Sequence, residues 1–261
     1  MRHAFVIARR EIESYFVSPI AYAVMTIFTF VTGLFFSNML VYYVRQAALA
    51  DQQLQRFGRS ELQLDVPTMV LSQFFGNEGF LLMFALPLLT MGLITDERRK
   101  GTLELLMTSP VRATELTLGK FLGAFGFVVI LLLPLLPMFY FLAQGGQWEP
   151  GVVFAGILGL LLLAAAQIAL GLFISSLCEN VLVSAIGTYG LFLTMQFIDT
   201  STSGPDSLWA SFVSYFSFYM RHINSTRGVI AVADLVYFAS YVALGLFLAQ
   251  RSIDAIRYKR T

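Results

Sequence analysis

Residues 151–177 read GVVFAGILGLLLLAAAQIALGLFISSL, an apolar run without a charged side chain. The hydrocarbon core of a bilayer is about 30 Å thick and takes about 20 apolar residues of α-helix to cross. Backbone groups in lipid must pair within the segment, and the run does not alternate as a membrane β-strand would. Five further runs share this character. The sequence therefore predicts an all-α membrane protein with six transmembrane helices, at residues 19–44, 79–95, 121–143, 151–177, 181–198 and 229–249.

The composition of the whole chain agrees with a membrane protein. Of the 261 residues, 57% are hydrophobic and 13% are charged, whereas soluble domains average about 45–50% and about 25%. The formal net charge of +1 gives no attraction for polyanions, so we expect no nucleic-acid partner. The longest loops, of about 30 residues, are too short for a second core. Residues 1–261 are therefore expected to form a single transmembrane domain.

Lysine and arginine are unevenly divided between the two sides of the predicted membrane. With six helices, both termini and the second and fourth loops share one side, which carries twelve of these residues against five on the other. Basic residues are enriched in the cytoplasmic loops of membrane proteins. We therefore expect a multi-pass protein of the inner (plasma) membrane, with both termini in the cytoplasm.

Residues 2–17, before the first predicted span, carry apolar side chains on one helical face. These side chains are Phe5, Ala8, Ile12, Tyr15 and Phe16. Arg9 and Glu13 lie four residues apart and can form an ion pair. The pattern predicts an amphipathic helix in the cytoplasmic membrane interface, with surrounding lipid as its partner. A polar, partly helical tail is the alternative.

Residues 95–110 read TDERRKGTLELLMTSP and lie on the expected cytoplasmic side. Gly101 can end the preceding helix, and Thr102 can cap a new one that Pro110 stops. Glu104 would lie in the first turn, where the helix dipole favours an acid. The short helix would present an apolar stripe formed by Leu103, Leu106 and Met107. Such a stripe can be buried in a groove on a soluble partner or in the lipid surface, and the pattern does not decide between them.

Residues 208–221 are apolar and aromatic but too few to cross a bilayer. Aromatic side chains favour the depth of the lipid headgroups. We interpret this stretch as a re-entrant or interfacial segment in the outer leaflet, and a plain extracellular loop is the alternative. Backbone that does not span is tolerated at that depth where protein or a cavity surrounds it.

Motifs for catalysis and nucleotide binding are absent from the sequence. It contains no G-x-x-x-x-G-K-[ST], no H-E-x-x-H and no G-x-S-x-G, so we expect no catalytic residues. His3 and His222 fall on opposite sides of the predicted membrane, and the lone Cys178 cannot form an intrachain disulfide. We therefore expect no metal site in this chain.

Ionisable residues within the predicted spans are scarce, although such residues mark transport pathways in membrane proteins. Asp199 and Asp234 lie near the outer ends of the fifth and sixth spans. We interpret Asp234 as a structural ion-pair partner of Arg227. A carrier coupled to protons or sodium would hold acids near the midplane, which disfavours a self-contained secondary carrier.

The cytoplasmic stretch resembles the coupling-helix region of ABC-2-type permeases. The resemblance is carried by Glu97, by the run from Gly101 to Leu106, by Thr108 and Pro110, and by the following Gly119-Lys120. Two further stretches are similar, Arg10-Glu11 with Tyr15-Phe16 before the first span and Gly171 to Leu177 at the end of the fourth. The stretch from Ser225 to Ile230, with Asp234 and Tyr237-Phe238, is similar to the gliding-motility-type subfamily.

The resemblance implies that the chain is the permease subunit of an ABC transporter. Such a subunit catalyses no reaction itself. Such permeases form dimers, either with an identical chain or with a different permease chain. A separate cytosolic ATPase, which binds ATP and Mg²⁺, docks on the coupling helix, here about residues 100–110. The family mostly exports. The resemblance makes residues 208–221 an outer gating element with Trp209, Phe212 and Phe216 as gate residues. It places ATPase coupling at Glu97, Gly101, Thr102, Glu104, Leu105 and Thr108.

Two alternatives to an exporting permease stay open at this point. One is a membrane module that transports nothing and relays the work of the ATPase to a periplasmic accessory subunit. The charged first loop, residues 45–77, is the place where such a subunit would make contact, and its apolar residues 66–75 can form a short helix. The other alternative is the self-contained secondary carrier.

Overall fold

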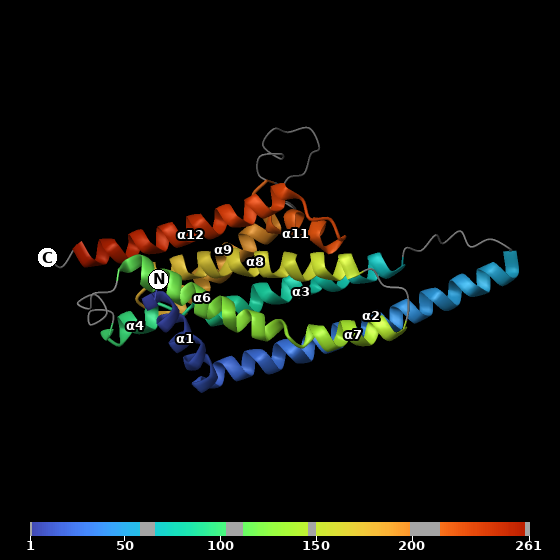
Figure 1. The fold of residues 1–261 in the computed structure, drawn as a ribbon, viewed down its shortest axis with the longest axis horizontal. Coiled ribbons are helices and arrows are strands. Elements are labelled where there is room, and N and C mark those ends of the chain that lie inside the picture. The colour runs from blue at the N-terminus through green and yellow to red at the C-terminus, as the bar shows by residue number, and fades with distance from the viewer. Residues whose placement is uncertain (1, 58–65, 103–111, 146–149, 199–214, 259–261) are drawn as a thin grey trace.

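The computed structural model describes residues 2–57, 66–102, 112–145, 150–198 and 215–258. All regular elements in these ranges are helices, which confirms an all-α membrane protein. Figure 1 shows most of them lying lengthwise in one bundle, with α1 crossing it at a steep angle. Both chain termini and α4 lie at the same end, which we call the termini end, and we call the opposite end the far end.

Seven helices make up the length of the bundle. They are α2 (Pro19–Phe57), α3 (Val66–Thr90), α6 (Ala113–Leu132), α7 (Leu135–Gly145), α8 (Pro150–Leu177), α9 (Val181–Phe197) and α12 (Val232–Tyr258). Three further helices in the described residues are α1 (Arg2–Val17), α4 (Thr95–Arg99) and α11 (Phe218–Thr226). A break at Leu133 and Pro134 separates α6 from α7, because proline has no N–H for the helical ladder.

Five helical stretches in the described residues are long and apolar enough to cross a membrane: Pro19–Gln55, Leu71–Arg99, Ala113–Leu142, Pro150–Leu177 and Val232–Ile256. The predicted fifth span corresponds to α9, which has 17 residues and measures about 26 Å. That length is short of the hydrocarbon thickness of about 30 Å. The predicted count of six spans is therefore not confirmed.

The first predicted loop, residues 45–77, is helical over its described parts, which include the short helix expected at residues 66–75. α2 continues without a break from Pro19 to Phe57, and α3 already begins at Val66. The sequence beyond residue 44 is rich in Ala, Gln, Leu and Arg, which are strong helix formers, so the helix continues after its apolar part ends. Figure 1 shows α2 reaching past the ends of α3 and α8 at the far end.

The core of the bundle is built around α8, which packs against α3, α6, α9, α11 and α12. Its small and aliphatic side chains are buried along most of its length. In the most apolar stretch of each helix, 67% of the α3 residues and 61% of the α8 residues are buried, against 28% in α2. The stretches Ala113–Leu142 and Val232–Ile256 have 33% buried each, so α2, α6 and α12 are all peripheral to the core formed by α3 and α8.

The predicted N-terminal helix is present as α1 and packs on α6. Ala8 and Tyr15 of the predicted apolar face are buried, and the Tyr15 hydroxyl donates to the Leu89 carbonyl at 2.9 Å. Phe5, of the same predicted face, is 75% exposed. The pair of Arg9 and Glu13 is confirmed, with 2.9 Å between Nε and Oε1. The apolar face of α1 therefore serves in part to hold the helix against protein.

Candidate functional site

Lys120 is a buried lysine that joins three helices at the termini end. It lies in the first half of α6, and its side chain is 3% exposed. Its Nζ atom is 3.2 Å from Oε2 of Glu11 on α1 and 2.9 Å from Oε1 of Glu97 on α4. We call these three residues the Lys120 cluster. The cluster connects the N-terminal helix and the first helix after α3 to the same point on α6.

The Lys120 cluster carries two carboxylates for one ammonium group. The side chains of Glu11 and Glu97 are 18% and 16% exposed, and Oε2 of Glu97 is buried without a hydrogen-bond partner among the described residues. Removing one partner from a buried ion pair leaves an uncompensated charge, which is strongly destabilising. The position of α4 therefore depends on the positive charge of Lys120.

The sequence prediction assigned Glu97 to the ATPase-coupling site, and the structure turns its carboxylate toward Lys120. Lys120 and Glu11 belong to the stretches that carry the family resemblance but were not predicted as site residues. One signal points to Lys120. A lysine that directly precedes a long apolar run, here two turns after the start of α6, needs an anionic partner when it is buried, although the sequence does not say which one.

Ser175 near the end of α8 holds the start of α4. Its hydroxyl oxygen accepts the N–H groups of Ile94 and Thr95, at 3.0 and 3.2 Å. The Thr95 hydroxyl donates to the Ser175 carbonyl at 2.8 Å. The first N–H groups of a helix have no partner within it, and the N-cap residue of α4, Ile94, supplies no side-chain bond. A residue of α8 thus caps α4.

A second contact fixes the other end of α4. Arg98 forms an ion pair with Glu179, which follows α8, and its Nη2 atom lies 2.5 Å from Oε1 of Glu179. Gly171, one turn before Ser175, faces the side chain of Thr90, and any larger residue there would collide with it. The stretch from Gly171 to Leu177, which resembles ABC-2-type permeases, therefore forms the surface of α8 that packs against the connection between α3 and α4.

The segment leaves α4 through Gly101, as predicted. Gly101 has a φ of +71°, in the left-handed region that glycine adopts without steric cost, and its N–H donates to the Arg98 carbonyl at 3.2 Å. The Thr102 hydroxyl donates back to the Glu97 carbonyl at 3.3 Å. The other predicted coupling residues, Glu104, Leu105 and Thr108, lie outside the described residues.

Glycines on α6 allow α1 to approach closely. A methyl group at Gly119 would lie 2.7 Å from Cβ of Ile7, and one at Gly123 would lie 2.5 Å from Cβ of Glu11. The spacing of these two glycines is the G-x-x-x-G pattern, which lets two helix backbones meet. This approach brings Glu11 within reach of Lys120.

A second polar group lies where α11 meets α12. Arg221 Nη1 is 3.1 Å from Oδ1 of Asp234, and Nδ2 of Asn224 is 3.2 Å from Oδ2 of the same carboxylate. The prediction that Asp234 pairs with Arg227 is wrong. Arg227 is the exposed C-cap of α11, whereas Arg221 and Asn224, three residues apart in the helix, share the face that meets Asp234.

The predicted outer gate is described only in part. Trp209 and Phe212 lie outside the described residues, and Phe216 is 38% exposed. The Phe216 carbonyl accepts a hydrogen bond from the Tyr237 hydroxyl at 3.0 Å. From residue 218 onward the predicted re-entrant segment is the helix α11, which packs on α8 and α3.

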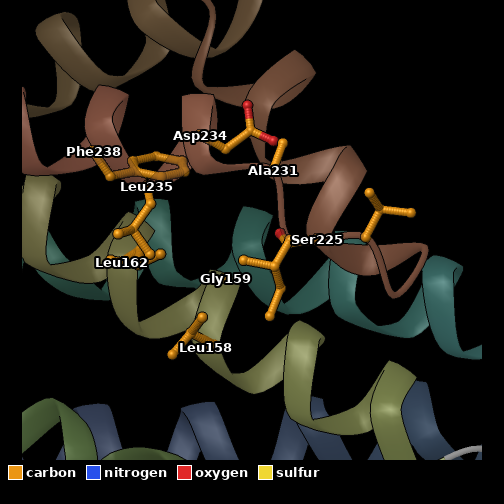
Figure 2. Close-up of a pocket in the computed structure, with 10 residues that line it drawn as sticks. Leu158, Gly159, Leu162, Ser225, Ala231, Asp234, Leu235 and Phe238 are labelled. Atoms are coloured by element: carbon orange, nitrogen blue, oxygen red, sulfur yellow. The ribbon is translucent and has the colours of Figure 1, made fainter.

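A small hollow adjoins the Arg221–Asp234 pair. Figure 2 shows it between α8 and the connection from α11 to α12, with Gly159 facing Ser225. Its lining is apolar except for Ser225 and Asp234. Gly159 is required here because a side chain on it would collide with Ser225. Its described lining offers no set of polar groups with which to recognise a ligand.

Comparison with known protein families supports one assignment. Residues 2–231 match the family model for the ABC-2 type transporter, a range that includes the Lys120 cluster, Gly101 and the Arg221 side of the second polar group. No curated protein matches the chain. The match is to the family as a whole, and membership of the gliding-motility-type subfamily stays a prediction. The matched range covers most of the 261 residues, so the chain belongs to the ABC-2 type transporter family, as the permease subunit of an ABC transporter.

Proposed function

We propose that this permease is an exporter driven by a separate cytosolic ATPase, which docks at about residues 100–110. The observation that carries the proposal is the Lys120 cluster, which ties the helix just before that segment to α1 and α6. The excess of Lys and Arg predicted on the side of the termini supports a cytoplasmic termini end.

The contacts of α4 supply a route for force from the ATPase to the bundle. Displacing Gly101 displaces α4, which is bonded to α8 through Ser175 and to α6 through Lys120. A chain of packed elements and ion pairs of this kind carries coupling between distant sites. ATP binding at the docked ATPase would therefore move α1, α6 and α8 together rather than one helix alone.

The proposed complex contains two permease chains and their ATPase subunits. The family associates with an ABC ATPase and dimerises, and this chain would meet either an identical copy or a different permease. ATP and Mg²⁺ would be bound by the ATPase, because the permease does not itself hydrolyse ATP. The permease contributes docking and the transport path.

The docking proposal is tested with Glu104→Arg in the purified complex. Because Glu104 belongs to the segment proposed to dock, the variant should insert normally but lose its bound ATPase. Glu13→Arg is the matched control, since Glu13 is an exposed acid on α1 whose side chain is 63% exposed. Co-purification of a tagged ATPase, followed by ATP-driven uptake into inverted vesicles, measures both steps. Full association and full uptake with Glu104→Arg would contradict the docking site.

One observation favours a second candidate, a module that relays ATPase work to a partner at the far end. The helix α2 has 39 residues and is about 58 Å long, far more than a bilayer core of about 30 Å requires. Residues 51–55 at its end are exposed. A photocrosslinker at Gln52 would capture an accessory subunit in native membranes, with Tyr22, exposed near the other end of α2, as the control position. Capture at Gln52 without any measurable export would favour the relay.

A further inference from the structure

Glu78 is an acidic residue buried inside the bundle, where the sequence prediction placed no charge. It lies in α3, within the membrane-crossing stretch Leu71–Arg99, and it is 0% exposed. An ionisable residue inside a membrane-spanning segment is costly and is usually retained for function. The residue is not part of the Lys120 cluster or of the Arg221–Asp234 pair.

The carboxyl group of Glu78 has one described hydrogen-bond partner. The Thr32 hydroxyl on α2 donates to Oε2 at 3.0 Å, and Oε1 is buried without a partner among the described residues. One turn away, the ring centroids of Phe36 and Phe74 are 6.0 Å apart, and those of Phe74 and Phe139 are 5.7 Å apart. The group therefore lies between α2 and α3 beside an aromatic cluster.

The helices packed on α3 bring no positive charge to this carboxyl. Residues 19–44 of α2 contain tyrosine as their only titratable type, and α8 contains no titratable residue. In α9 the single titratable residue is Tyr189, whose hydroxyl donates to the Phe84 carbonyl. Within residues 71–95 Glu78 is the only Asp, Glu, Lys, Arg or His.

The basic residues of α11 are also engaged elsewhere. Arg221 is bonded to Asp234, and Nε2 of His222 lies 3.1 Å from the Phe75 carbonyl. Burial lowers the pKa of His222, so its ring is neutral at pH 7. Lys120, on α6, is held by Glu11 and Glu97. A charged Glu78 would therefore be an unpaired buried anion, which proteins avoid by neutralising the group.

We propose that Glu78 is a proton-binding site, occupied while α2 and α3 are in contact and vacated when the two helices separate. Water reaching the carboxyl between the helices would let it ionise and release its proton. Only 28% of the most apolar stretch of α2 is buried against the described residues, so much of the surface of α2 is not held by the rest of the chain. A metal cation fits less well, because one carboxyl and one hydroxyl cannot replace the six or so oxygen ligands that hard cations prefer.

The resting state is tested by infrared spectroscopy of the full permease with its ATPase in lipid nanodiscs. A protonated carboxyl gives a C=O stretching band that moves on exchange from H₂O to D₂O. We expect such a band at neutral pH in the natural chain and its loss in Glu78→Gln. Glu13→Gln, at an exposed acid, is the matched control and should leave the band unchanged.

A second variant keeps the test decisive if Glu78→Gln does not fold. Thr32→Val retains the acid and removes its hydrogen-bond donor, so the band should remain and shift to higher frequency. A natural chain without the band, or a band that neither variant changes, would overturn the site. If the same band depends on sodium concentration at fixed pH, Glu78 binds a metal cation, and the proposal that it binds a proton is overturned.

The release step rests on the proposed function and has its own measurement. Trapping the complex with a slowly hydrolysed ATP analogue should weaken the Glu78 band, because α2 and α3 would separate. A band of unchanged intensity in the trapped complex would overturn release while leaving proton binding in place. If no ATPase associates with the chain, the proposed function fails, and the resting-state band still decides whether Glu78 holds a proton.

Discussion

The Lys120 cluster and the Arg221–Asp234 pair both join helices through opposite charges, but they join very different parts of the chain. Lys120 binds Glu11 and Glu97, which lie 109 and 23 positions before it. Arg221 and Asp234 are 13 positions apart in consecutive helices. The side chain of Lys120 is 3% exposed and that of Arg221 is 21% exposed. The Lys120 cluster determines how helices assemble at the termini end, whereas the Arg221–Asp234 pair holds only the connection between α11 and α12.

The largest effect is expected from Lys120→Met, which breaks the long-range set. The variant leaves two carboxylates without their cation. The free energy of unfolding should therefore fall by about 3–5 kcal/mol. Denaturant titration of the purified permease in mixed micelles measures it. Lys100→Met, the same change at an exposed lysine of the same end, is the control and should change the unfolding free energy little.

A triple variant tests whether the charge imbalance causes that loss. Adding Glu11→Gln and Glu97→Gln to Lys120→Met removes all three charges, so most of the unfolding free energy should return. If the triple variant is as unstable as Lys120→Met, shape rather than charge dominates at this site.

Gly123→Ala should have the next largest effect, because it weakens the approach of α1 while keeping every charge. The added methyl group would lie 2.5 Å from Cβ of Glu11 and 3.1 Å from the Ala8 carbonyl oxygen. Overpacking of this kind costs about 1–3 kcal/mol, measurable by the same titration. Gly190→Ala, at a helical glycine of α9 with nothing within 4 Å, is the matched control. Equal stability of the two variants would contradict tight packing of α1 on α6.

Asp234→Asn should have a smaller effect, because the pair it breaks is local and partly exposed. Arg221 keeps its contact with the Tyr215 ring, whose centroid is 4.6 Å from the guanidinium carbon. A hydrogen bond to a charged group contributes about 1.5–3 kcal/mol, and we expect a loss of unfolding free energy near the lower value. A loss as large as that of Lys120→Met would remove the distinction between the two sites.

Arg9→Ala should have the smallest effect and sets the baseline for ion pairs at the termini end. Arg9 and Glu13 are 81% and 63% exposed, and such pairs contribute about 0.3–0.5 kcal/mol on a helix. Thermal unfolding of the detergent-solubilised permease should change little. A marked loss would mean that this part of α1 contacts more than solvent.

The helices were predicted well from the sequence where long apolar runs determine them. The residues 151–177 and the glycine turn at Gly101 are found as expected. The polar end of α2 was missed because helix propensity continues after hydrophobicity stops. Glu78 was missed because Gln73, Asn77 and Glu78 lower the hydropathy at that point. The second span was therefore started one residue too late to include it.

The partners of buried charges could not be predicted from sequence spacing. Glu11 lies on a separate helix from Lys120, and their contact depends on α1 crossing α6 at the two glycines. Arg227 and Asp234 are closer in sequence than Arg221 and Asp234, but the end of α11 at Thr226 places Arg227 beyond the last turn. Periodicity describes one helix at a time, and these pairs depend on how two helices meet.

The cap that Ser175 places on α4 has a consequence for how the protein is made. Residues 95–99 leave the ribosome long before residue 175, so the first N–H groups of α4 have no lasting partner during most of synthesis. The helix α4 reaches its final geometry only after the last turn of α8 has been inserted. An ATPase that docks next to α4, as proposed, would therefore meet α4 in its final geometry only after α8 is complete.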